Sequence, residues 1–441
     1  MTMLSRHALS RRSLLLAGGG LAWTLSAKNI AWAAGDAVDN VLAGRLGQVI
    51  AARVDAEPGG GPVFLRSYDG SAGTGADADP ALATAAFTYD NALAVIALLA
   101  SGHRAQALRI GEALLAAALH DRAGSGRGTG GRLRNAYRAG PQPDVPLPNG
   151  WWDKARGQWL EDDYQVGTAT GNVAWAGLAL MALSERSRDR RYVEGAAAAA
   201  LWAVDHAASS IGAGGFSGGL HGGEATQKPL GWKATEHNID LAALFWRLGH
   251  FGAAEPVPGF WHIQEQAARS FVQAMWDEGQ GYFLTGAGPD GVSLNRSTSG
   301  LDVQFWAQML PDAPGNWRRA VAYAERAHGV AGGFSFNNDR AGLWTEGTAQ
   351  GALCYRILGE ADKADACLSS VAAQQSPGGY LWATPMSRLP TGLKIGPDSK
   401  TADFFYYHQP HLGATAWAVI AAQGLNPLTG RLLYTQGDGT P

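Results

Sequence analysis

The stretch Glu236–Leu248, EHNIDLAALFWRL, begins with polar and acidic residues and continues as a run of small and large apolar side chains. If this stretch is helical, its apolar residues cover nearly every side of the helix. A helix that is apolar all round is buried on all faces, so this segment is predicted to lie inside the molecule. Candidate chemistry is then confined to its polar first turn.

The same pattern of a polar start and an apolar helix recurs along the chain. The other segments that share it are Tyr89–Ala100, Gly171–Leu183, Leu301–Leu310, Thr345–Leu358 and His411–Ala422. Between them lie more polar segments whose apolar residues recur at three- and four-residue spacing, which is typical of a helix with one buried stripe. These amphipathic segments are roughly Asp39–Val54, Arg104–His120, Tyr192–Ala207, Ile263–Trp276, Trp317–His328 and Ala361–Ala373.

Turns in which Gly precedes an aromatic residue follow most of the amphipathic segments, as at Gly214-Gly215-Phe216 and Gly332-Gly333-Phe334. Gly permits tight turns, and the flanking residues can form short strands. The order of outer helix, Gly-rich loop and inner helix repeats six times. We therefore predict an all-α fold, an (α/α)6 toroid of six helical hairpins with short β-strands in the loops. An open helical solenoid is the alternative, and the count of six favours closure.

The first 33 residues are predicted to be a targeting signal. They contain the twin-arginine pattern SRRSLL at residues 10–15, a short apolar run and a small-residue cleavage site at Ala31-Trp32-Ala33. The apolar run is too short to span a bilayer, so no membrane association is expected after cleavage. A periplasmic or secreted location is expected. Residues 38–425 are predicted to form the single toroid domain, and residues 426–441 a C-terminal tail.

Composition excludes several classes of function. The chain has 441 residues and a formal net charge of -3, which implies neither nucleic-acid binding nor a basic membrane patch. Its two cysteines, Cys354 and Cys367, fall on consecutive predicted helices of one hairpin. They could form a disulfide or remain two buried thiols. We find no cluster of His and Cys typical of a metal site and no glycine-rich phosphate loop. We expect a monomer without cofactor or metal.

This layout resembles the six-hairpin glycosidase superfamily, which includes polysaccharide hydrolases, some lyases and sugar epimerases. The resemblance covers roughly residues 38–425. It rests on the repeat and on the motifs TYDNA (88–92), EHNID (236–240), LDVQ (301–304) and WTEGTAQ (344–350). It implies a carbohydrate substrate and, because characterised rings of this superfamily are often inverting, hydrolysis with inversion. It does not assign an acid/base pair.

Acidic side chains at the starts of different inner helices are the candidate catalytic groups. Each acid alone is explained by the helix dipole, which favours a negative charge in the first turn. As a set, however, they would crowd like charges into one cavity and raise some carboxyl pKa values. Glycoside hydrolysis needs that environment, because one carboxylic acid must protonate the leaving oxygen while a carboxylate activates water or attacks carbon. The predicted catalytic residues are Asp90, Glu236 and Glu346.

Glu236 and Glu346 are the candidates for the acid, and Asp90 is the candidate base, for which Asp302 is an alternative. Asp240 lies one turn after Glu236 and is expected to contact it or a sugar hydroxyl. Aromatic faces pack against the C–H faces of sugar rings, which makes tryptophan and tyrosine candidates for a binding groove. The predicted substrate-binding residues are Tyr89, Tyr137, Trp152, Trp232, His237, Asp240, Asp302, Trp344 and His411.

Three functions fit these features. The first is an exported glycoside hydrolase that cleaves a polysaccharide or oligosaccharide. The second is a polysaccharide lyase or sugar epimerase with a His or Tyr base, for which His237 and His411 are candidates. A lyase also needs a cation that neutralises the carboxylate of the uronate. Arg132, Arg134 and Arg138 are candidates for that cation, so a lyase stays possible. The third is a non-catalytic glycan-binding protein of an exopolysaccharide pathway.

Overall fold

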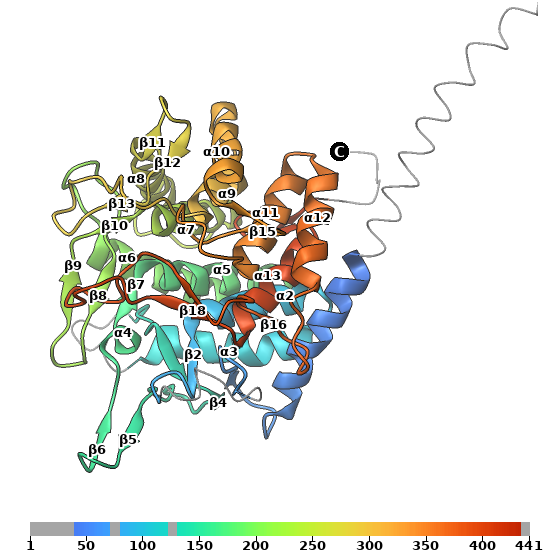
Figure 1. Ribbon diagram of the computed structural model, residues 1–441. Coiled ribbons are helices and arrows are strands. Elements are labelled where there is room, and N and C mark those ends of the chain that lie inside the picture. Colours follow the sequence, from blue (N-terminus) through green and yellow to red (C-terminus); the bar gives the residue numbers. More distant parts are fainter. Residues whose placement is uncertain (1–38, 71–79, 122–129, 434–441) are drawn as a thin grey trace, which may run out of the picture.

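The computed structural model describes residues 39–70, 80–121 and 130–433, so the predicted signal lies outside the described residues. Two layers of helices make up this part of the chain (Figure 1). The inner helices are α2 (Thr88–Ala100), α5 (Thr170–Ser187), α7 (Thr235–Phe251), α9 (Asp302–Met309), α11 (Thr345–Ile357) and α13 (Leu412–Ala422). The outer helices are residues 39–56, α3 (Arg104–His120), α6 (Arg190–Ala207), α8 (Phe260–Ala274), α10 (Arg319–Ala327) and α12 (Ala361–Ala372).

The inner helices form a closed ring. Each one packs against the next in the order α2, α5, α7, α9, α11 and α13, and α13 packs against α2. Every residue of α13 is buried, as its apolar sequence predicts. Each buried Leu, Ile or Val side chain contributes roughly 1.5–3 kcal/mol through removal of apolar surface from water. The structure therefore confirms the predicted toroid and not the open solenoid.

One backbone hydrogen bond recurs at each junction of the ring. The N–H group at or just before the start of an inner helix donates to a carbonyl in the loop that leads into the next inner helix. The six bonds run from Thr88 to Asn135, Thr170 to Gly218, Thr235 to Thr285, Leu301 to Phe336, Thr345 to Ala383 and Leu412 to Ser67. The last bond joins the final hairpin to the loop before α2, so the bonds form a closed circle. They also satisfy N–H groups that helix starts leave without partners.

A polar side chain in the first turn of an inner helix fixes the Gly-aromatic turn before that helix. Asn238 accepts from the N–H of Phe216 and donates to its carbonyl. On four other inner helices a polar side chain likewise accepts from an N–H group of the preceding loop, in the pairs Asn91 and Leu65, Gln304 and Phe283, Thr348 and Phe334, and Thr415 and Leu381. Asn91 and Gln304 also donate to the carbonyl of the same loop residue. The motifs noted in the sequence therefore contain residues that build the ring itself.

The first and last hairpins meet where residues 39–56 complete the outer layer. Arg356, in the last turn of α11, forms an ion pair with Asp39 and donates to the carbonyls of Ala421 and Ala422. The two cysteines are free and buried, which agrees with the pair of thiols and not with the disulfide.

Short antiparallel strands lie in the loops, as predicted. They pair as β1 (Val63–Phe64) with β4 (Gly140–Pro141), β2 (Ala85–Phe87) with β3 (Ala136–Arg138), β5 (Trp151–Asp153) with β6 (Gln158–Leu160), β7 (Thr168–Ala169) and β9 (Lys228–Leu230) with β8 (Gly219–His221), β10 (Lys233–Ala234) with β13 (Gly286–Ala287), β11 (Trp276–Asp277) with β12 (Tyr282–Phe283), β14 (Gly329–Val330) with β15 (Gly333–Phe334), β16 (Leu381–Trp382) with β19 (Pro410–His411), β17 (Arg388–Pro390) with β18 (Phe405–Tyr407), and β20 (Leu425–Asn426) with β21 (Arg431–Leu432). The β5–β6 hairpin projects from the body of the molecule (Figure 1).

Candidate active site

Acidic side chains from four inner helices gather at one end of the ring. Asp90 lies in the first turn of α2, Glu236 in that of α7, Asp302 in that of α9 and Glu346 in that of α11. They meet because neighbouring inner helices run in the same direction, so their N-terminal ends share one face of the ring. Asp90, Asp302 and Glu346 are buried, whereas Glu236 retains partial exposure.

Glu346 is held by groups from two other hairpins. The hydroxyl of Tyr89 donates to Glu346 Oε1 at 2.7 Å, and the indole N–H of Trp417 donates to that hydroxyl at 2.8 Å. The second carboxylate oxygen, Oε2, is buried without a hydrogen bond. Burial raises the pKa of Glu346 to about 7, and the charge of Asp90 adds to the effect, while nearby His411 opposes it. Glu346 therefore changes its charge near neutral pH.

Asp90 pairs with a histidine from the last hairpin. Nε2 of His411 lies 3.3 Å from Asp90 Oδ2, and Nδ1 of the same ring lies 3.8 Å from Glu346 Oε2. The two carboxylates also approach each other above Gly413. A methyl carbon at Gly413 would lie 2.6 Å from Asp90 Oδ1 and 3.1 Å from Glu346 Oε2. These two oxygens are therefore at most about 5.7 Å apart, closer than the ~6.5–9.5 Å that an inverting pair needs.

A second acidic group surrounds Glu236. Burial raises the pKa of Glu236 well above its usual range, and the charges of Asp302 and Glu346 add to the increase. Burial likewise raises the pKa of Asp302 to about 6. Asp240, one turn further along α7, is fully buried, and burial raises its pKa well above the usual range, while its interaction with the Trp175 side chain opposes the increase. The predicted proximity of Asp240 and Glu236 is consistent with their electrostatic interaction.

His237 and Asp240 both lie close to Gly171 of the neighbouring helix α5. Its ring packs against Trp232, with ring centroids 5.4 Å apart, and its Nδ1 atom is buried without a partner. Burial lowers the pKa of His237 to about 4, so the ring is neutral at physiological pH. Gly171 makes room for this arrangement, because a methyl carbon there would lie 2.5 Å from the His237 ring and 3.2 Å from Asp240 Oδ2.

Three tryptophans fill the centre of the ring. Trp175, Trp306 and Trp417 come from α5, α9 and α13, and their ring centroids lie 5.3 to 5.7 Å apart. Trp175 also packs edge-on against Tyr89. All three indoles are buried, so they belong to the core of the ring.

The other predicted aromatic contacts divide into two groups. Trp232 is partly exposed and Trp152 is 59% exposed on β5. Trp344 is buried against Phe336, and Tyr137 is fully buried with its hydroxyl donating to Asp121 at 2.7 Å. The structure therefore does not bring Tyr137 and Trp344 to a surface where they could present a ring face to a sugar.

Three residues near the acids, Tyr68, Tyr406 and Trp417, were missed by the sequence reasoning. Tyr68 stacks on His411, with centroids 4.8 Å apart and planes at 24°, and Tyr406 packs edge-on against the same ring at 6.0 Å. Both come from loops in which no periodic pattern marks a functional residue. Trp417 was missed for a different reason, because a tryptophan inside an apolar helix is typical of a core residue.

Of the arginines considered for a uronate carboxylate, Arg132 and Arg134 are already engaged, whereas Arg138 is exposed on β3. Arg132 and Arg134 both form ion pairs with Asp121, and Arg134 also pairs with Glu224. Among the described residues, the ion pairs of Asp90, Glu236, Asp240, Asp302 and Glu346 involve only His411 and neither arginine nor lysine. The described residues also contain no cluster of three or more His, Cys, Asp or Glu suited to a metal ion.

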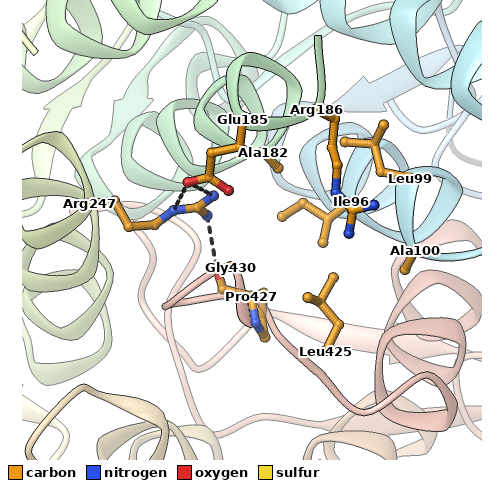
Figure 2. A pocket seen from close by; sticks show the side chains of 10 residues that line it. All are labelled: Ile96, Leu99, Ala100, Ala182, Glu185, Arg186, Arg247, Leu425, Pro427 and Gly430. Atoms are coloured by element: carbon orange, nitrogen blue, oxygen red, sulfur yellow. Dashed lines mark hydrogen bonds and ion pairs between the residues drawn. The ribbon is translucent and has the colours of Figure 1, made fainter. Parts of the chain in front are cut away.

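The opposite end of the ring is closed by the chain itself. Figure 2 shows a small hollow at the C-terminal ends of α2, α5 and α7, where Arg247 pairs with Glu185 at 2.8 Å and donates to the carbonyl of Pro427 at 3.1 Å. The β20–β21 hairpin packs against α13 at this end. The acidic residues lie at the other end of the inner helices. No helix in the described residues is long and apolar enough to cross a membrane.

Comparison with known proteins places the fold. No protein-family model matches the chain, and no curated protein matches its sequence. A solved glycosidase is 14% identical with a TM-score of 0.57 over 88% of this chain and 98% of its own; one of its variants was solved with glucose. A cellobiose 2-epimerase from Spirochaeta thermophila is 14% identical with a TM-score of 0.60 over 90% of this chain and 97% of its own. The chain therefore has the same (α/α)6 toroid fold as these solved structures.

Proposed function

We propose that the protein is a glycoside hydrolase in which Glu236 is the general acid and Glu346 the general base. The observation that carries the proposal is that the carboxyl groups of Glu236 and Glu346 come from different inner helices, lie at the same end of the ring and interact electrostatically. Burial raises the pKa of Glu236 well above its usual range and that of Glu346 to about 7. A carboxyl group whose pKa is raised by burial can hold a proton near neutral pH and act as a general acid.

The proposed reaction is hydrolysis with inversion. Glu236 gives its proton to the glycosidic oxygen as the bond between that oxygen and the anomeric carbon breaks. Glu346 takes a proton from a water molecule, whose oxygen bonds to the anomeric carbon from the opposite face. Exchange with solvent then restores both carboxyl groups. Glu346 is favoured over Asp90 as the base because Asp90 is paired with His411.

The charge of the site favours an uncharged sugar at the reacting position. Five carboxyl groups gather there, and a uronate would add a further negative charge with no arginine or lysine to balance it. Arg132 and Arg134 are held by acidic residues of their own. This charge distribution argues against the lyase alternative, which needs a cation beside the uronate. The proposed substrate is a neutral polysaccharide or oligosaccharide outside the cytoplasm. The predicted twin-arginine signal would export the protein to that location.

A sugar epimerase is the second candidate because of one observation. The ring of His237 is neutral and its Nδ1 atom is without a hydrogen bond, so it is suited to accept a proton from carbon. His411 is less suited to that role, because its nitrogens face Asp90 and the backbone N–H of Ala414.

Product analysis separates these functions. The purified protein is incubated with a panel of neutral and acidic polysaccharides and oligosaccharides, and new reducing ends, ultraviolet absorbance and sugar composition are measured. New reducing ends without absorbance are expected. An unsaturated, absorbing product would identify a lyase, and a changed sugar at constant chain length an epimerase. Binding without any product would identify a glycan-binding protein.

Isosteric variants test the assignment. Glu236→Gln and Glu346→Gln should each lower kcat by at least ~100-fold, because each removes one proton transfer, while glycan binding persists. Glu194→Gln is the matched control, since that side chain is 65% exposed on an outer helix. Full activity of either catalytic variant would reject the assigned roles.

A further inference from the structure

His411 lies between the two carboxyl groups that come closest together in the site. Its Nε2 atom is 3.3 Å from Asp90 Oδ2 and its Nδ1 atom is 3.8 Å from Glu346 Oε2. His411 is 4% exposed, and Tyr68 stacks on one face of its ring. It therefore contacts the proposed base and a neighbouring acid while being shielded from solvent.

The backbone around His411 is fixed from several directions. The residue ends β19, which pairs with β16, and it forms a further bridge with Tyr68. Its carbonyl accepts from the hydroxyl of Thr415 at 2.7 Å. The neutral ring also caps α13, because Nδ1 accepts from the N–H of Ala414 at 3.3 Å. Protonation of Nδ1 would exchange that long cap bond for an ion pair with Glu346.

Gly413 allows the side chains of Asp90, His411 and Glu346 to pack closely together. Any side chain at this position would collide with Asp90 Oδ1, His411 Cε1 and Glu346 Oε2, which lie 2.6, 2.9 and 3.1 Å from the place of its first carbon. The absence of a side chain lets the start of α13 approach α2 and α11 closely. The three groups are therefore held together by backbone packing and not by their own attraction alone.

We propose, on the basis of the hydrolase function above, that His411 and Asp90 are a positioning pair for Glu346. Asp90 orients the ring through Nε2, and the ring presents its other nitrogen, with a positive charge when protonated, to the carboxylate of the base. Neither residue bonds to the sugar in this arrangement. The pair keeps Glu346 ionised at a lower pH than its burial alone would allow.

The charges that face Glu346 agree with this role. Asp90 is on α2, Glu236 on α7, Asp302 on α9 and His411 at the start of α13, so three acids and one histidine surround the base. The hydroxyls of Tyr68, Tyr89 and Tyr406 also face it. Burial lowers the pKa of His411, but Asp90 and Glu346 raise it above its usual value overall. The positive charge of His411 thus lowers the pKa of Glu346.

The test uses His411→Asn and the double variant His411→Asn with Asp90→Asn. Asparagine caps helices well, so the single variant keeps the cap and removes the ring. It leaves Asp90 without its partner, and the acidic limb of the kcat/KM profile should move to higher pH. If the acidic limb moves by one pH unit, kcat/KM at pH values below its midpoint falls ~10-fold, while the plateau value of kcat/KM at higher pH is retained. The double variant removes the unpaired carboxylate as well, so the limb should return toward the wild-type position.

A measurement without catalysis separates this proposal from the proposed function. The ¹³C signal of the Glu346 carboxyl group, identified by its loss in Glu346→Gln, is titrated in each protein. A higher midpoint in His411→Asn that falls again in the double variant supports the positioning pair, even if no glycan is hydrolysed. An unchanged midpoint in folded His411→Asn overturns it. Loss of activity at every pH with an unchanged midpoint also overturns it, because His411 would then act on the substrate directly.

Discussion

Replacement of Glu346 by Gln should stabilise the folded protein, and the gain should depend on pH. The side chain is 1% exposed, its Oε2 atom has no hydrogen bond, and burial raises its pKa from an ordinary value of 4.5 to about 7. Between pH 4.5 and about 7, the folded state therefore keeps a proton on Glu346 that the unfolded state has already released. Since the folded state binds more protons there, the free energy of unfolding of the wild type falls as pH rises through this window.

The size of the gain follows from that interval. One pKa unit corresponds to about 1.36 kcal/mol, so the interval from 4.5 to about 7 corresponds to about 3 kcal/mol. Glutamine cannot ionise and keeps an acceptor for the 2.7 Å hydrogen bond from Tyr89. Glu346→Gln should thus differ little from the wild type below about pH 4.5 and be about 3 kcal/mol more stable above about pH 8.

Urea denaturation at a series of pH values measures this difference directly. Glu194→Gln is the matched control, because an exposed side chain should change the free energy of unfolding by less than about 0.5 kcal/mol at every pH. A Glu346→Gln protein that is less stable than the wild type by the same amount at all pH values would refute the reasoning. The carboxyl group would then ionise without penalty in the folded state, and its assignment as a base near neutral pH would lose its physical basis.

Three further predictions follow from other parts of the molecule. Asn238→Ala should lower the free energy of unfolding by about 1–3 kcal/mol, measured by urea denaturation, because it leaves buried backbone groups of the preceding turn without partners; the pH profile of the remaining activity should not move. Trp152→Ala and Trp159→Ala remove side chains that are 59% and 44% exposed on the projecting hairpin. Each should raise KM for a long glycan several-fold, which corresponds to about 0.5–1.5 kcal/mol per aromatic contact, with little change in KM for a short glycan. A reducing agent should leave Tm unchanged, as calorimetry can check, because Cys354 and Cys367 are free thiols.

The fold could be predicted from the sequence because its cause is local. A helix such as Glu236–Leu248, which is apolar on nearly every side after its polar first turn, has to be buried, and an amphipathic one such as Arg104–His120 has to cover it. Six such pairs bury one another only when they surround a common centre. The acidic first turns then share one end of the ring, so the gathering of Asp90, Glu236 and Glu346 follows from the same pattern.

The roles of the polar residues in those first turns could not be predicted. The motifs at residues 88–92 and 236–240 each contain an acid that belongs to the candidate site and an asparagine that fixes a turn. The two kinds of residue are neighbours in sequence and differ only in which side of the helix meets the preceding loop. Sequence reasoning therefore found the acids but did not distinguish the asparagines that build the ring.

What the sequence by itself determined is thus the ring, its burial pattern and the end at which its acids meet. Only the tertiary structure decided which groups touch: Tyr89 reaches Glu346 across 257 residues and Trp417 across 328, and His411 enters between two carboxylates from the last hairpin. The physical reason is that periodicity reports the environment of one helix at a time. Distances between side chains on different hairpins, and the pKa shifts that depend on them, exist only once the ring has closed.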